Sequence, residues 1–503
     1  MSNLWIINAC LPPGFQSTQE DPGYEGYEGT WTVQCSNGMV TGVFQTGDSE
    51  MGNPVAEDLQ LVDARGGLVL PSLCHAHIHL DKCFILDRCG DLITGGFNEA
   101  MAFTAKAKQS FPADLDDLYR RGAQLIEESV ENGVTSMRAH VEVDEIVRFS
   151  CLEVAIKLKA QYEDICYIQI AVFAQEALFK NASDVEPGEN YKILCQAAKV
   201  EGVSAVGSAP YVEPTTEQAK KNIALVFEAA MNSGDGLRHI DFHLDYNLNP
   251  TAEPLIYEVI TQARIYCSSR PKEKASRARP RITIGHATRL QLFSPAEWRS
   301  LSASISDLPI TLVGLPQSDM YMQGRDYWDD PLGPPRSTLR VPFLEEAYGI
   351  KVAMAVNNVD NGFTPQGTLD PLSSLVTFGV AVFQAATPRA IRTLIESVTV
   401  ISKQAIGLEP CNSAAASEMS VDKGEDDSGV SSSLSSEKRA HAARTLPTDL
   451  FPTRGDQADF VILHDNKTLR SVALNPSFER TTIKNGKVIA RRQKRRWIVG
   501  NSN

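Results

Sequence analysis

Short apolar runs alternate with longer helix-period stretches through the middle of the chain. The helix-period stretches include residues 117–133 and 215–236, and both close on a glycine suited to a helix C-cap. The apolar runs are rich in branched residues, as strands buried on both faces should be, and there are eight: residues 67–73, 133–141, 166–174, 203–209, 237–244, 281–287, 309–315 and 350–356. Eight strand–helix units in series predict an α/β protein with a (β/α)8 TIM barrel. The rival fold, an open doubly wound sheet, would require a glycine-rich phosphate turn after an early strand, and the sequence has none there.

The two ends of the chain follow a different pattern. Residues 1–66 and 450–503 contain short strand-like runs that are typical of β-hairpins, and Asn485-Gly486 is a good tight-turn signal. We expect the two ends to meet as one small composite β-sandwich domain, with residues 67–409 forming the barrel between them.

One segment departs from a globular composition. Residues 410–449 are rich in serine, alanine and charge, and the stretch from Asn412 to Arg444 has no aromatic residue. Such a segment buries too little apolar surface to offset its own ordering entropy. We expect a disordered, low-complexity surface insertion here.

The charge balance narrows the range of partners. The 48 basic and 62 acidic residues give a net charge of −14, which repels phosphate groups and argues against binding to nucleic acid or to an anionic membrane. The apolar stretches fall short of the ~20 residues that a membrane span needs, and the first residues lack the features of a signal peptide. The ten cysteines are scattered without a C-x-x-C pair, so we expect neither a disulfide framework nor a cysteine zinc site. These features favour a cytoplasmic protein that acts on a small molecule, and they are compatible with a homo-oligomer.

The histidines carry the main functional signal. Four of the nine, His77, His79, His243 and His286, lie at or just past the carboxyl ends of predicted barrel strands, where barrel active sites assemble. His77 and His79 are two apart on an extended segment, so their side chains point the same way and can share one metal ion.

On these residues the sequence resembles the amidohydrolase superfamily, and within it the cytosine deaminase-like branch. The resemblance runs over about residues 67–384, and the terminal hairpins match the composite β-domain that such enzymes carry. The matching segments are HIHLDK with His77 and His79, AVFAQEAL with Gln175, GSAPYVEPT, DFHLDY with His243, TIGHAT with His286, MQGRD and QGTLDPL.

The resemblance implies a metal-dependent hydrolase. It assigns His77, His79 and His243 as metal ligands, His286 to the reactive water, and Gln175 to a cyclic amide edge of the substrate. Neutral imidazoles suit one divalent ion, Zn²⁺ or Fe²⁺, which would lower the pKa of a bound water towards ~7 and so provide a hydroxide. The strand VSAVGSAP ends without the lysine that bridges two metals in binuclear members, so we expect one ion.

Lys82 and His140 complete the residues assigned near the barrel mouth. Lys82 follows the histidine pair too closely to bridge two metals, and we expect it to form an ion pair with a carboxylate at the barrel mouth. His140 ends the second predicted strand, and we assign it to the substrate site, with a hydrogen bond inside the barrel mouth as the simpler role.

Two positions depart from the family pattern. Asn357 stands at the position of the eighth-strand aspartate, which is both ligand and proton shuttle, and Tyr246 stands at the position of the usual shuttling glutamate. An amide oxygen can ligate a metal weakly but cannot take a proton, and a phenol is a poor base at its ordinary pKa of ~10. We keep Asn357 as a metal ligand and Tyr246 as a catalytic residue with Asp245, and the candidates to replace the missing acids are Asp245, Asp319 and Asp360.

The sequence therefore predicts a mononuclear metal-dependent amidohydrolase that hydrolyses a non-peptide C–N bond of a small cyclic or heteroaromatic molecule. Deamination of a pyrimidine-like or triazine-like ring comes first, and ring-amide hydrolysis second. The alternative is a catalytically impaired barrel that binds a small metabolite. A third reading is a scaffold that works through the segment 412–444.

Overall fold

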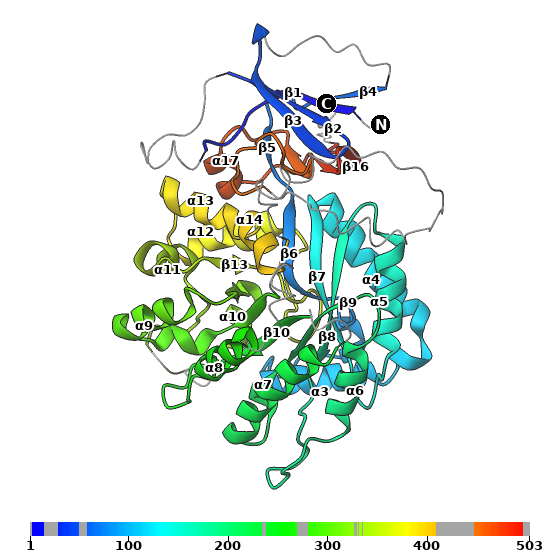
Figure 1. Cartoon of the computed structure of the whole chain (residues 1–503), viewed down its shortest axis with the longest axis vertical. Coiled ribbons are helices and arrows are strands. Elements are labelled where there is room, and N and C mark those ends of the chain that lie inside the picture. Colours follow the sequence, from blue (N-terminus) through cyan, green and yellow to red (C-terminus); the bar gives the residue numbers. More distant parts are fainter. Residues whose placement is uncertain are drawn as a thin grey trace, which may run out of the picture.

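The computed structural model describes residues 3–14, 29–49, 58–233, 238–268, 280–325, 329, 331–333, 335–408 and 447–495. It shows a barrel with a smaller β-domain packed at one end (Figure 1). Of the expected insertion over 410–449, residues 410–446 lie outside the described part of the chain, so its disorder stays a prediction. Within the described ranges, no helix combines the length and the apolar character that a membrane crossing requires.

The barrel is a sheet of eight parallel strands in the order β13-β12-β11-β10-β9-β8-β7-β6. Backbone hydrogen bonds complete the circle between the first strand and Asn357, because Asn357 donates its N–H to the His77 carbonyl and accepts the N–H of His79. The predicted α/β TIM barrel is confirmed. The strands are β6 (Leu73–His79), β7 (Val134–Glu142), β8 (Tyr167–Ala174), β9 (Val203–Ser208), β10 (His239–Leu244), β11 (Ile282–His286), β12 (Ile310–Gly314) and β13 (Val352–Met354).

The prediction for the first barrel strand was wrong. Residues 67–73 include β5 (Leu68–Pro71), which pairs antiparallel with β14 in the terminal domain. The barrel begins instead at Leu73 with β6, whose seven residues are all buried. β5 is apolar, whereas β6 carries three histidines, and only Ser72 separates them. The hydrophobic pattern therefore ends with the first segment and does not tell which sheet that segment joins. As a consequence, His77 and His79 lie within β6, at its carboxyl end, rather than after a strand.

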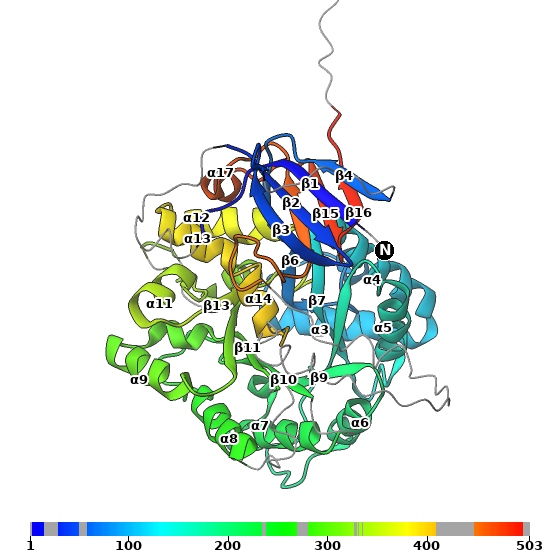
Figure 2. The ribbon, with the colours of Figure 1, turned by 45° about the horizontal axis from the view of Figure 1, so that its top comes forward.

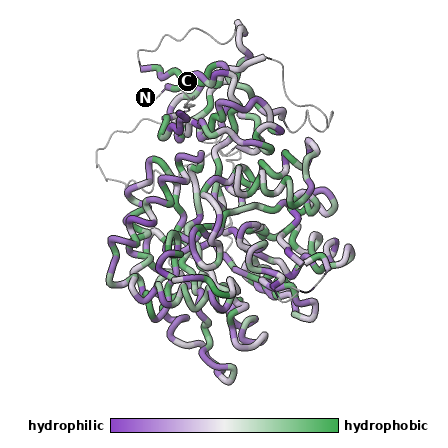
Figure 3. Tube along the Cα trace, turned by 180° about the vertical axis from the view of Figure 1, so that it is seen from behind, coloured by the Kyte–Doolittle hydropathy of each residue, from purple (hydrophilic) through white to green (hydrophobic). Residues whose placement is uncertain are grey.

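Helices surround the barrel, and hydrophilic and hydrophobic positions alternate along them (Figure 3). α4 begins after Asp114, whose carboxylate accepts the N–H of Asp117, and it buries an apolar stripe that includes Leu118 and Leu125. The helices are α2 (Leu86–Cys89), α3 (Phe97–Lys108), α4 (Leu115–Glu131), α5 (Ser150–Gln161), α6 (Glu189–Ala198), α7 (Thr216–Met231), α8 (Ile256–Ser268), α9 (Pro295–Ile305), α10 (Pro316–Met322), α11 (Val341–Tyr348), α12 (Phe378–Val382), α13 (Pro388–Glu396) and α14 (Val400–Ala405), with 3-10 turns η2 (Phe111–Ala113), η3 (Pro210–Val212) and η5 (Thr288–Leu292) and a π-helix η7 (Leu372–Thr377).

The terminal domain contains two four-stranded sheets, ordered β3-β2-β1-β4 and β16-β15-β14-β5. Strands from both ends of the chain lie side by side in it (Figures 1 and 2), and one apolar core joins residues of the two sheets, such as Leu4 with Phe460. Asn485 and Gly486 form the expected turn between β15 and β16, both at positive φ. The domain boundaries at 66 and 450 stay predictions. The elements are β1 (Asn3–Ala9), β2 (Trp31–Ser36), β3 (Met39–Gln45), β4 (Leu59–Asp63), β14 (Phe460–Leu463), α17 (Leu469–Leu474), β15 (Arg480–Lys484) and β16 (Lys487–Arg492).

Candidate metal centre and active site

Three predicted ligands converge at the carboxyl end of the barrel. The Nε2 atom of His243, on β10, lies 2.6 Å from Nε2 of His77 and 3.2 Å from Nε2 of His79. All three rings are buried, and their Nδ1 atoms have no hydrogen-bond partner among the described residues. Burial, followed by the charge of neighbouring groups, lowers the pKa of each of the three histidines well below its usual value. Three neutral imidazoles aimed at one point form a donor set that fits a divalent ion such as Zn²⁺ or Fe²⁺.

A buried polar group stands behind His77. Oδ1 of Asp241, on β10, lies 3.7 Å from Nδ1 of His77 and 3.1 Å from Nε2 of His140, and Oδ2 lies 3.1 Å from the Arg138 guanidinium. Burial by itself would raise the pKa of Asp241, but His140, His77 and Arg138 lower it well below its ordinary value. His77, His140 and Asp241 also form a second cluster of metal-type donors. The Arg138 charge already balances that of this carboxylate, which makes no hydrogen bond to His77.

A glycine next to these rings has no room for a side chain. A Cβ atom at Gly285 would stand 3.1 Å from the His77 ring, so any larger residue there would push against the proposed ligand. His140 itself lies beside His77, with 4.0 Å between ring centroids, and it does not line the cavity. Its predicted contact with substrate is therefore not carried into the proposal below.

Asn357 brings its side chain to the same place. It follows β13 at a φ of 69°, in the left-handed region where a non-glycine residue costs of order 1–3 kcal/mol. Its Nδ2 donates to Ser318 Oγ at 2.8 Å, and its Oδ1 is buried with no partner among the described residues. An unpartnered acceptor beside His79 on the cavity wall suits the predicted role as a weak further ligand, which stays a prediction.

His286 is held by a carboxylate. It ends β11, and its Nδ1 lies 2.7 Å from Oδ1 of Asp319, on α10. The other oxygen of Asp319 accepts hydrogen bonds from the Thr338 hydroxyl at 2.7 Å and from the Leu315 N–H at 3.2 Å. Burial raises the pKa of Asp319, against the opposing effect of the His286 hydrogen bond. The pair fixes the orientation of the imidazole and leaves Nε2 as the remaining ring nitrogen.

The other two predicted catalytic residues differ in position. The Tyr246 ring stacks on His286 with centroids 3.8 Å apart, and its hydroxyl donates to the Ser318 carbonyl at 3.3 Å. Burial raises the pKa of Tyr246 well above its usual value, so the phenol stays protonated and acts as a donor rather than a base. Asp245 instead accepts the N–H groups of Leu255 and Ile256 at the start of α8, and it does not line the cavity. This geometry gives Asp245 a structural role, and we do not carry it forward as catalytic.

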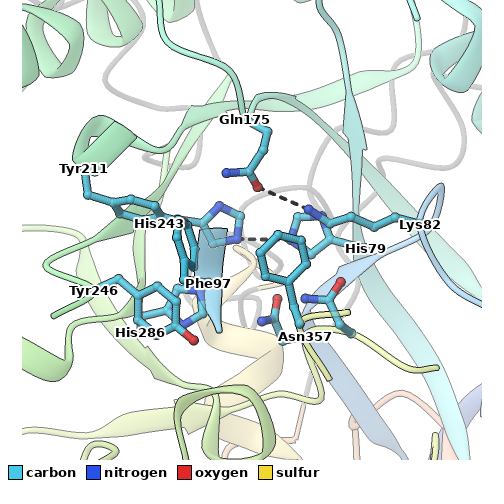
Figure 4. Close-up of a pocket in the computed structure, with 11 residues that line it drawn as sticks. His79, Lys82, Phe97, Gln175, Tyr211, His243, Tyr246, His286 and Asn357 are labelled. Atoms are coloured by element: carbon cyan, nitrogen blue, oxygen red, sulfur yellow. Dashed lines mark hydrogen bonds between the residues drawn. The ribbon is translucent and has the colours of Figure 1, made fainter. Parts of the chain in front are cut away.

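A cavity opens beside the histidines (Figure 4). The predicted residues His79, Gln175, His243, Tyr246, His286 and Asn357 line it. The sequence did not single out four further lining residues, Phe97, Tyr211, Asn358 and Phe363. The Phe97 ring lies 5.8 to 6.1 Å, centroid to centroid, from the rings of Tyr211, Tyr246 and Phe363, so four aromatic side chains surround the space. Phe97 opens α3 and Tyr211 lies in η3, and aromatic residues in such positions read as ordinary core from sequence alone.

Lys82 also lines the cavity. Its Nζ donates to Glu142 Oε1 at 2.9 Å, which confirms the expected ion pair at the barrel mouth. The same Nζ donates to Gln175 Oε1 at 3.1 Å. Glu142 in turn contacts Lys108 at 2.6 Å, and Lys108 contacts Asp144 at 2.5 Å. Burial would raise the pKa of Glu142, but Lys108 and Lys82 lower it to about 2, so this carboxylate is charged at neutral pH.

Comparisons with known proteins agree with this architecture. No protein-family model matches the chain. The N-isopropylammelide isopropyl amidohydrolase of Pseudomonas sp. strain ADP is 24% identical over 241 residues, which cover 47% of this chain and 54% of that protein, about half its length. The pterin deaminase of Rhizobium rhizogenes is 25% identical over 386 residues, which cover 73% of this chain and 76% of that one.

Solved structures extend the likeness to almost the whole chain. The 5-methylcytosine deaminase of Klebsiella pneumoniae with phosphonocytosine aligns at a TM-score of 0.74 and 20% identity, covering 98% of this chain and 100% of that one. Guanine deaminase of E. coli aligns at 0.54 and 14% identity, covering 98% and 99%. The relatives and structural neighbours are deaminases and hydrolases of the amidohydrolase superfamily, and the named relatives act on C–N bonds. The resemblance inferred from the histidine motifs is confirmed at that level.

Proposed function

We propose that this chain, whose relatives and structural neighbours are deaminases and hydrolases of the amidohydrolase superfamily, is a mononuclear metal-dependent amidohydrolase that removes an amino group from a small heteroaromatic ring. The observation that carries the proposal is the convergence of three buried Nε2 atoms, from His77, His79 and His243, on one point beside a small cavity. Hydrolysis of a ring amide is the second reaction that the same site would support.

The metal would be held by His77, His79 and His243, with the Asn357 amide oxygen as a weak additional ligand. Imidazole suits both zinc and iron, so the donor set is compatible with either. When bound, such an ion supplies Lewis-acid activation of a water molecule. We propose a single ion because Asp241, which could hold a second one together with His77 and His140, already forms an ion pair with Arg138.

His286 would move the proton. Because its Nδ1–H is donated to Asp319, the Nε2 lone pair of the neutral imidazole is the acceptor. We propose that Nε2 takes a proton from the attacking water and delivers it to the departing amine nitrogen. The stacked Tyr246 ring and the Asp319 carboxylate keep the imidazole in one orientation throughout. This pair supplies the proton chemistry for which the Asn357 amide and the Tyr246 phenol are unsuited.

The walls of the cavity set the shape of the substrate. Four aromatic rings bound the space. Flat aromatic walls suit a planar ring, such as an aminopyrimidine or aminotriazine. Gln175 would bind the edge of that ring that is remote from the reacting carbon.

Ammonia release tests the proposal directly. The purified, metal-loaded protein is incubated with a panel of amino-substituted pyrimidines and triazines, and ammonia is measured with a coupled assay. We expect release from at least one monocyclic compound, abolished in His243→Ala and strongly reduced in His286→Ala. The absence of ammonia from every compound would contradict the proposal, provided that metal is bound.

The alternative is a metabolite-binding barrel without turnover, and one observation favours it: Asn357 cannot take up a proton where the family pattern has an aspartate. Such a protein would be stabilised against heat by one of the same heterocycles without releasing ammonia. The panel therefore separates the two functions if melting temperature and ammonia are recorded on the same samples.

A further inference from the structure

The amide of Gln175 has one satisfied and one unsatisfied end. Its Oε1 accepts a hydrogen bond from Lys82 Nζ at 3.1 Å, whereas its Nε2 is buried and makes no hydrogen bond of good geometry among the described residues. The Tyr211 hydroxyl is near this nitrogen, but an amide nitrogen has two N–H donors, so one still lacks an acceptor. Figure 4 shows the amide at the cavity wall, with the bond from Lys82 on its oxygen side. A buried donor that lacks an acceptor costs free energy, and at a cavity wall a ligand is the group that can supply one.

Lys82 determines which end of the amide faces the cavity. An ammonium group has three donors and no acceptor, so only an oxygen can sit against it. A flip of the Gln175 amide would place its NH₂ group against the ammonium and lose the hydrogen bond. The orientation follows from the chemistry of the neighbour rather than from the similar shapes of oxygen and nitrogen.

Lys82 is itself held rigidly. Its side chain is 2% exposed and donates to Glu142 Oε1 at 2.9 Å. Glu142 is fixed from two further directions, by Lys108 Nζ at 2.6 Å and by its own N–H, which donates to Asp81 Oδ2 at 2.6 Å. The ammonium therefore cannot follow the amide if the amide turns, and the chain of contacts keeps one orientation of Gln175.

We propose that Lys82 is a positioning residue that locks the Gln175 amide with its NH₂ group towards the cavity, so that the site selects rings with a hydrogen-bond acceptor, such as a carbonyl oxygen, on that edge. This inference rests on the proposed function, because it names the chemistry of the substrate edge in the same cavity. Rings that present an amino group to Gln175 place donor against donor and bind weakly.

Two inert ligands of the same size test whether Lys82 holds the Gln175 amide in one orientation. The first, 2-pyridone, presents a ring carbonyl, and the second, aniline, presents an amino group on a ring of the same size. Their dissociation constants are measured by calorimetry on the metal-loaded full chain. We expect wild type to prefer 2-pyridone by at least about tenfold, the effect of one well-placed hydrogen bond. We expect Lys82→Met, which keeps the length of the side chain but has no donor, to reduce that preference to less than about threefold.

Three further variants make the result specific. Gln175→Leu removes the amide and should abolish the preference. Lys82→Gln offers both donor and acceptor, so it frees the amide to turn and should lower the preference even if Lys82→Met fails to fold. Lys403→Met is the matched control, because Lys403 is also a buried lysine but bonds Ser72 in place of Gln175, and it should leave the preference intact.

The outcomes distinguish this inference from the proposed function. Three results would overturn the proposed role of Lys82. They are equal binding of the two ligands by wild type, an unchanged preference in Lys82→Met or Lys82→Gln, and an equal loss of the preference in Lys403→Met. None of these measurements depends on turnover, because neither ligand carries an activated amino group. If the protein prefers 2-pyridone but releases no ammonia from any heterocycle, the proposed role of Lys82 stands and the proposed deamination is wrong.

Discussion

The proposed proton chemistry depends on His286 and Asp319, two residues that the sequence named separately. The four histidines could be predicted to converge because residues two apart on a strand share a side and because barrel strands end on one face. Asp319 could be named only as one of three candidate acids. It lies on α10, and its 2.7 Å contact with His286 depends on how the segment after β12 packs, which no local pattern encodes. Asp245, adjacent to the metal motif in sequence, bonds the start of α8 instead.

Asp319→Asn should therefore impair turnover without emptying the metal site. The Leu315 N–H and the Thr338 hydroxyl both donate to Oδ2, so the amide would keep its oxygen there and turn its NH₂ group towards Nδ1 of His286. That favours the wrong tautomer of the imidazole, and we expect kcat to fall by about 10²–10⁴-fold, the usual contribution of a positioned acid–base group. Metal content and the affinity for 2-pyridone should change little, and steady-state kinetics with elemental analysis measure both. Asp360→Asn is the control, because Asp360 lies outside the cavity lining. Equal activities of the two variants would contradict the assignment of the pair.

At the scale of elements, the alternation of apolar runs and helices was enough to predict the barrel but not the sheet to which each run belongs. β5 is apolar, β6 carries three histidines, and the two are nearly contiguous. Only their partners, β14 and β7, show that they belong to different sheets. The position of the start of α3 could not be predicted from the sequence pattern either. Glu99 on its first turn accepts the N–H groups of Ile93, Thr94 and Gly95, and so fixes the loop that leads to Phe97. Sequence patterns do not show that this loop reaches over the mouth of the barrel.

Phe97 should act as the limit on substrate size. Its ring closes the aromatic wall of the cavity, so Phe97→Ala would remove side-chain volume there and admit larger rings. We expect the variant to gain affinity for bicyclic heterocycles by about tenfold relative to monocyclic ones, measured by thermal shift or by kcat/KM on both ring classes. Phe343→Ala, an exposed aromatic on α11 away from the cavity, is the control. An unchanged ratio in Phe97→Ala would show that another wall sets the size.

At the scale of the whole molecule, the two chain ends were predicted to meet because both show hairpin patterns, and the structure shows why they stay attached to the barrel. The guanidinium of Arg480, on β15, bonds both oxygens of Asp370 at 2.7 Å, and its Nη1 also bonds the Asn132 carbonyl at 2.8 Å. Asp370 lies two residues before η7, and Asn132 follows α4. The sequence gives no sign of this contact, because its partners are 110 residues apart and each resembles an ordinary surface charge.

Breaking this contact should destabilise the whole protein. Asp370→Leu leaves the Arg480 charge buried and unpaired, which costs about 3–5 kcal/mol. We expect a lower melting temperature in calorimetry, partly restored in the double variant Asp370→Leu with Arg480→Met, which removes both charges. Glu189→Gln breaks the exposed pair with Arg148 and should hardly shift the melting temperature. A double variant no more stable than Asp370→Leu alone would argue against a charge effect.

Metal stoichiometry tests the central claim most directly. Elemental analysis of the purified protein should find close to one zinc or iron per chain, and His243→Ala should lose it while keeping the circular dichroism spectrum of wild type. His464→Ala, which changes a histidine of the terminal domain, should keep the metal. A wild-type protein without bound metal after loading, or a His243→Ala variant that retains a full equivalent, would contradict the three-histidine site.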